Sequence, residues 1–182
     1  MKKIFVAIVG LAIFVNFSVC QAKIVRVADE GAENLYQNIS QFFGTNSNPM
    51  ILGNLHRVAG KDFSVMNQRA FECQFGNYSQ PFGEIVFYVD SAGYVSDILL
   101  HVNFNTDITS SDITKLTGTM FYCLGLSATE AKTLYFEMQT DAETGLTFSK
   151  VWSPLRNKLF VMYKFEEASE CTYTLYADDG RD

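Results

Sequence analysis

The sequence predicts an α+β domain in which an antiparallel sheet of about six strands carries helices packed on one face. Six stretches have the patterning of β-strands, three before and three after a central pair of helical stretches. Another helical stretch precedes the first strands, so helices and strands are segregated along the chain. Segregated elements with short strand connections are typical of α+β domains.

The first half of the chain is predicted to hold one helix and three strands. In residues 33–43, apolar side chains recur at helical spacing, and residues 69–75 alternate as a half-buried strand does. A short strand is also possible at 23–27. Residues 84–89 and 94–104 form the clearest hairpin. On its second strand the residues expected to face the core are Tyr94, Ile98, Leu100, Val102 and Phe104; those expected to face away are Asp97, His101 and Asn103.

The second half is predicted to hold two helices and three strands. Apolar spacings of three and four mark residues 111–124 as an amphipathic helix that Gly125 ends. Ser127 and Glu130 form a capping box that starts a second helix, through about residue 139. Strands follow at 146–152, 158–166 and 171–176. The middle one is apolar on both faces, which favours a central strand or a curved sheet.

Residues 1–22 have the three parts of a secretory signal peptide. Lys2 and Lys3 are followed by an uncharged run at 4–15 and by a small residue, Ala22, after which cleavage fits best. The run is shorter than the roughly 20 apolar residues of a spanning helix. We therefore expect a periplasmic or extracellular protein, with 23–182 as a single domain and no membrane span after cleavage. An uncleaved anchor or acylation of Cys20 are the alternatives.

Charge narrows the choice of partner. The signal holds two of the 14 basic residues and none of the 20 acidic ones, which leaves residues 23–182 with a net charge of −8. That balance argues against nucleic acid or an anionic membrane surface as the partner, because proteins bind both through clustered Lys and Arg side chains. It permits a basic protein partner, although an acidic surface also simply favours solubility.

Cleavage would leave three cysteines, Cys73, Cys123 and Cys171. An oxidising compartment favours one disulfide among them, and the sequence does not choose the pairing. Cys123 with Cys171, which would join the end of a helix to a strand, is the marginal preference. Inert buried thiols are the alternative.

No motif of catalysis or cofactor binding is present, so we expect no catalytic residue, no metal ligand and no cofactor; whether the chain is an enzyme stays open. Only two histidines exist, His56 and His101, and His101 is a candidate binding residue on the polar side of a strand. Trp152 and Arg156 flank a turn and are residue types enriched at binding hot spots. The alternative is that Trp152 caps the core edge.

Three functions fit these observations. The first is an exported, small, acidic, non-enzymatic binding protein, such as an inhibitor or an immunity-type protein acting on another protein. The second is an envelope protein that binds a small hydrophobic ligand between sheet and helices, which the surplus of Phe, Tyr and Met suggests. The third is a hydrolase with an unfamiliar site, built on His101 or His56 with a carboxylate.

Overall fold

The predicted α+β class is confirmed. The computed structural model describes residues 25–43 and 50–180, which form three α-helices and one sheet of nine strands. The sheet is larger than the six strands expected because it includes three two-residue strands: β1 (Ile51–Leu52), β2 (His56–Arg57) and β6 (Gln139–Thr140). Such strands are too short to show alternation in a sequence.

The six long strands are all antiparallel to their neighbours. They are β3 (Arg69–Gly76), β4 (Pro81–Val89), β5 (Val95–Asn103), β7 (Thr147–Ser153), β8 (Lys158–Glu166) and β9 (Glu170–Asp178). Their order in the sheet is β3-β4-β5-β9-β8-β7. Each half of the sheet is therefore an antiparallel three-stranded meander preceded by helix, and the last strands of the two meanders, β5 and β9, meet at the centre.

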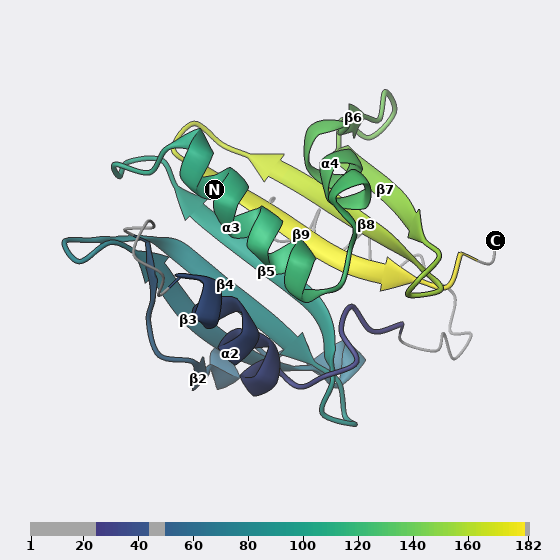
Figure 1. Ribbon diagram of the computed structural model, residues 1–182, viewed down its shortest axis with the longest axis horizontal. Coiled ribbons are helices and arrows are strands. Elements are labelled where there is room, and N and C mark those ends of the chain that lie inside the picture. The colour runs from purple at the N-terminus through teal and green to yellow at the C-terminus, as the bar shows by residue number, and fades with distance from the viewer. Residues whose placement is uncertain (1–24, 44–49, 181–182) are drawn as a thin grey trace.

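The helices lie together on one face of this sheet. Figure 1 shows α2 (Ala32–Phe43) in front of β3 and β4, α3 (Ser110–Cys123) in front of the centre, and α4 (Ala128–Phe136) toward β7 and β8. The core fills the space between them. Phe87, Ile98 and Leu175 are cross-strand neighbours in one row of the core face, and each is almost completely buried.

Local sequence signals set the helix ends. Thr109 and Asp112 form a capping box at the start of α3, and the predicted capping box of Ser127 and Glu130 starts α4. Gly125 adopts a left-handed φ of 74° between the two helices, a conformation that costs glycine little. Helix α4 ends at Phe136 rather than near residue 139, and residues 139–140 pair with β7 as β6 instead.

A β-bulge changes the phase of β5. The register slips between Tyr88 and Val89, so that Ser96 is the extra residue opposite them. Tyr94, expected to face the core, is therefore 37% exposed, and the guanidinium of Arg26 lies 4.0 Å from its ring centroid. From Ile98 to Asn103 the predicted alternation holds, whereas Phe104, also expected to face the core, lies past the end of β5 and is 37% exposed.

The N-terminal predictions fall mostly outside the described residues. The signal peptide at 1–22 lies wholly outside them, and the described part of the possible strand at 23–27 is irregular. Among residues 25–43 and 50–180, none of the helices has both the length and the apolar character needed to cross a bilayer.

Candidate functional site: the open face of the sheet

The face of the sheet opposite the helices is lined by a mixture of aromatic and charged side chains. We call it the open sheet face; it carries every second residue of each long strand. Its central row runs across four strands as Tyr88, Asp97, Tyr176 and Val161. Most of these side chains are half-buried rather than fully exposed.

Aromatic rings form one side of the open sheet face. The rings of Tyr163 and Tyr176 are stacked, with centroids 5.8 Å apart and an angle of 11° between their planes. Phe148 lies beyond Tyr163, at 6.0 Å. Phe165 and Trp152 are also on this face, at its exposed edge. An apolar strip of this kind on an otherwise acidic protein is typical of a binding surface.

Asp97 is the central polar group of this face. It lies between Tyr88 and Tyr176 in the cross-strand register, and Gln68 Nε2 donates to its carboxylate at 2.5 Å and to Ser96 Oγ at 2.7 Å. Burial raises the pKa of Asp97, and the hydrogen bonds from Ser96 and Gln68 offset only part of this effect. No Lys, Arg or His among the described residues forms an ion pair with it.

Other carboxylates of the open sheet face do have a cation. Lys61 Nζ lies 2.6 Å from Glu72 Oε2 and also contacts Glu84, so that one ammonium group joins two strands. Burial alone would lower the pKa of Lys61, and the two carboxylates outweigh it and raise that pKa. Asp97 is thus the carboxylate of this face that is desolvated without a cationic partner among the residues described.

His101 lies on the open sheet face, as expected from its strand position. Its Nδ1 is 3.2 Å from Thr172 Oγ1 and its Nε2 is 3.8 Å from Glu170 Oε2. Four residues of strand, about 13 Å, separate it from Asp97. The residues around it are in unbroken antiparallel register, so the backbone N–H groups beside it are engaged in the ladder rather than aimed at a substrate oxyanion.

The two other predicted binding residues lie apart. Trp152 is 43% exposed on the open sheet face, where its ring approaches Gly180. Arg156 lies on the other side of the turn, with its guanidinium packed against Gly125 at the junction of α3 and α4. The structure therefore places Trp152 and His101 on the same face but at opposite ends of it and three strands apart, about 24 Å, and it places Arg156 on the helical layer.

The three cysteines are unpaired in the structure, and two of them, Cys73 and Cys171, are buried. Cys73 on β3 and Cys171 on β9 are three strand spacings apart, about 14 Å, and a disulfide needs Cα atoms within about 7 Å. That pairing is excluded by the topology. The Cys123–Cys171 pairing stays a prediction.

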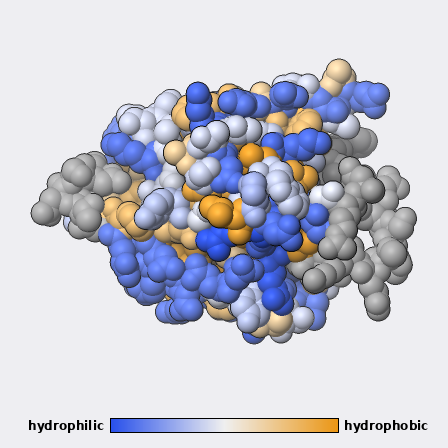
Figure 2. Space-filling model, turned by 45° about the vertical axis from the view of Figure 1, so that its right-hand side comes forward, coloured by the Kyte–Doolittle hydropathy of each residue, from blue (hydrophilic) through white to orange (hydrophobic). Residues whose placement is uncertain are grey.

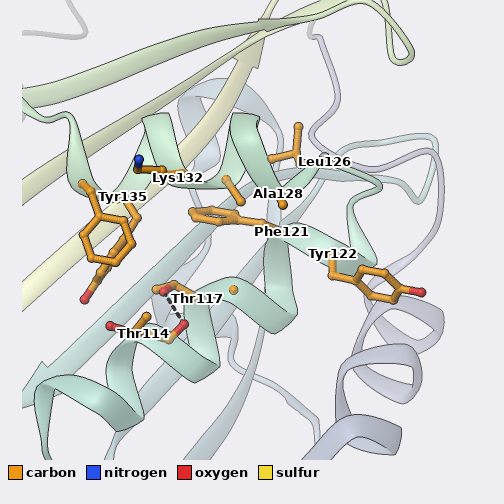
Figure 3. Close-up of a pocket in the computed structure, with 11 residues that line it drawn as sticks. Thr114, Thr117, Phe121, Tyr122, Leu126, Ala128, Lys132 and Tyr135 are labelled. Atoms are coloured by element: carbon orange, nitrogen blue, oxygen red, sulfur yellow. Dashed lines mark hydrogen bonds between the residues drawn. The ribbon is translucent and has the colours of Figure 1, made fainter.

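The helical layer carries two surface grooves. The more apolar one lies between α3 and α4 and has a volume of about 340 Å³; Figure 3 shows the ring of Phe121 between the two helices, with Tyr135 and Lys132 contributed by α4. The second, of about 400 Å³, lies between α2 and α3 and shares Tyr122 with the first. Neither groove separates the helices from the sheet, where core side chains fill the space.

Sequence reasoning missed the role of Asp97 and the groups that hold it. Gln68 and Lys61 lie in a stretch that shows no clear periodicity; Asp97 is 29 residues from Gln68, and Glu84 is 23 residues from Lys61. A signal for Asp97 did exist: the polar pair Ser96-Asp97 directly follows the apolar pair Tyr94-Val95, a break in alternation that indicates a bulge. Among the described residues no three His, Cys, Asp or Glu side chains gather as metal ligands would.

Comparison with known proteins adds no relative: no family model matches the chain, and neither a curated protein nor a solved structure is significantly similar to it.

Proposed function

We propose that this chain is an exported, non-enzymatic binding protein that acts on another protein, as an inhibitor or immunity-type protein does. In this proposal the open sheet face receives a basic segment of the partner. One observation carries it: Asp97 is desolvated, has no cationic partner among the described residues, and lies between two tyrosines at the centre of that face.

An arginine of the partner fits this position best. A carboxylate withdrawn from water gains more from a cation than an exposed one does. The planar guanidinium forms paired hydrogen bonds to a carboxylate and stacks on aromatic rings, here those of Tyr88 and Tyr176. Because Gln68 already fixes the carboxylate, little conformational freedom remains to be lost on binding.

The surroundings support a basic protein rather than a small molecule. Glu72, Glu84 and Glu170 share this face with Asp97, against the two cations Lys61 and Lys150, the second of which lies on β7 opposite Val161. The charge of the open sheet face is therefore negative on balance, in keeping with the acidic chain as a whole. A surface six strands wide, with Trp152 and Phe165 at its edge, has the aromatic residues typical of protein interfaces.

The test uses tetra-arginine as a defined basic probe, with binding followed by NMR at low ionic strength. We expect shifts of the backbone amides around Asp97 on β4, β5 and β9. Asp97→Asn keeps an oxygen for Gln68 and removes the charge, so affinity should fall about ten-fold, as for one charged hydrogen bond. Glu33→Gln on α2 is the control, because Glu33 is exposed on the helical layer and the substitution makes the same change in net charge there.

Two results would contradict the proposal. The first is an equal loss of affinity in both variants, which would show that only net charge matters. The second is a set of shifts confined to the helical layer. A salt dependence of binding is expected at either surface, so it does not distinguish the open sheet face from the helical layer.

A further inference from the structure

The groove between α3 and α4 has the shape of a site for one extended chain. Its lining runs along α3 from Thr114 to Tyr122, eight residues of helix or about 12 Å. Its volume of about 340 Å³ lies at the lower end of the range for small-molecule pockets, about 300–1,000 Å³.

The lining of the groove is mostly apolar. Phe121, Leu126 and Tyr135 provide its apolar surface, while Thr117 Oγ1 is engaged with the backbone of α3, where it donates to the carbonyl of Ile113. Figure 2 shows apolar residues gathered near the middle of a mostly hydrophilic view of the molecule. The lining also includes two exposed aromatic residues, Tyr122 and Phe136, at 66% and 64% exposed.

Among the described residues that line the groove, Lys132 is the only charged one. It makes no ion pair or hydrogen bond with any residue in the part of the chain that the structure describes. It is three residues from Tyr135 and so shares a helix face with it. A single unpaired ammonium group beside an apolar channel complements a ligand with one anionic end and one apolar chain.

We infer that the α3–α4 groove binds a medium-chain fatty acid, with the hydrocarbon chain along Phe121 and the carboxylate at Lys132. The small volume and the length of about 12 Å suit a single hydrocarbon chain, and the unpaired lysine selects a carboxylate over an alcohol of the same length. The hydrocarbon chain has room beside Gly118, because a Cβ built on that residue meets no atom within 4 Å.

Gly118 also provides the sharpest test, because a larger side chain there fills the groove without touching the core. Gly118→Leu should keep or raise stability, since leucine is the better helix former. Calorimetric titration of the purified protein with decanoate and with 1-decanol measures binding. We expect decanoate to bind, and Gly118→Leu to weaken it at least ten-fold.

Lys132→Met tests the headgroup contact and keeps the length of the side chain. We expect decanoate to bind about three- to ten-fold more weakly to this variant, with the affinity of 1-decanol unchanged. Lys115→Met, a cation on α3 outside the lining, should leave both affinities unchanged. The inference is overturned if decanoate does not bind, if Gly118→Leu leaves its affinity intact, or if the wild type prefers the alcohol.

Discussion

Gly83→Ala is a substitution for which strand propensity and the packing of the sheet predict opposite signs. Gly83 lies in β4, and propensity alone predicts that alanine stabilises a strand interior by about 0.5–1 kcal/mol. The structure predicts the reverse. A Cβ at Gly83 would lie 2.0 Å from the carbonyl oxygen of His101 and 2.8 Å from the ring of Phe75.

The size of this loss of stability follows from the displacement of the neighbouring backbone that the added Cβ requires. Normal contact requires at least about 1 Å of additional separation from the His101 carbonyl. That carbonyl belongs to the adjacent strand β5, so the hydrogen-bonded ladder has to open there. Overpacking of this kind costs about 1–3 kcal/mol, and a clash with backbone belongs at the upper end. We therefore expect Gly83→Ala to lower the free energy of unfolding by about 3 kcal/mol.

Urea unfolding followed by tyrosine and tryptophan fluorescence measures this loss. Gly118→Ala is the matched control: no atom lies within 4 Å of its Cβ, so it should raise stability by about 1 kcal/mol, as helix propensity predicts. If Gly83→Ala were as stable as the wild type while Gly118→Ala behaved as expected, the packing of β4 on β5 described above would be refuted.

Three further predictions concern ionisable groups. Because the pKa of Asp97 is raised, ionisation of this carboxyl group at neutral pH lowers the stability of the folded protein. Asp97→Asn should therefore be more stable than the wild type in urea titrations at pH 7, and the two proteins should be equally stable near pH 3. Lys61→Met should lose about 1–2 kcal/mol at pH 7, a modest value because its side chain is 36% exposed. Since the pKa of Lys61 is raised, a pH series should show its contribution constant between neutral pH and about pH 10.5 and lost as the pH rises through the raised pKa. Burial raises the pKa of Cys73 to about 12, and the partial burial of Cys123 raises its pKa to about 11, so both thiols should react with an aromatic disulfide reagent at pH 8 at least ten-fold more slowly in the native protein than in urea. A fast native reaction of either thiol would contradict its raised pKa.

Periodicity was sufficient to predict the long elements. All six long strands and the three helices lie within a few residues of the stretches expected, because alternation and helical spacing are local properties of a sequence. The interpretation of β8 needed the structure. Its apolar pattern on both faces, at Val161 and Tyr163 as well as Phe160 and Met162, comes from the aromatic strip of the open sheet face rather than from a covering layer.

The order of the strands could not be predicted in this way. The pairing of β5 with β9 joins residues more than 65 positions apart, and the alternation of a strand does not identify the strand with which it pairs. The same limit explains why the role of Asp97 was missed. The strand pattern predicted that Asp97 faces away from the core. Its burial, however, depends on Tyr176 from the other half of the chain and on Gln68 from a stretch with no periodicity.

The meeting of β5 and β9 has a consequence for how the protein folds. Each meander is made of contacts between neighbours in sequence, which form quickly, whereas the β5–β9 ladder must close a long loop and forms slowly. Asp97 and His101 both lie on β5 along this seam, opposite Tyr176 and Thr172 of β9. A chain in which only one half has folded therefore has no open-face site, so partner binding reports completion of the whole fold rather than of either part.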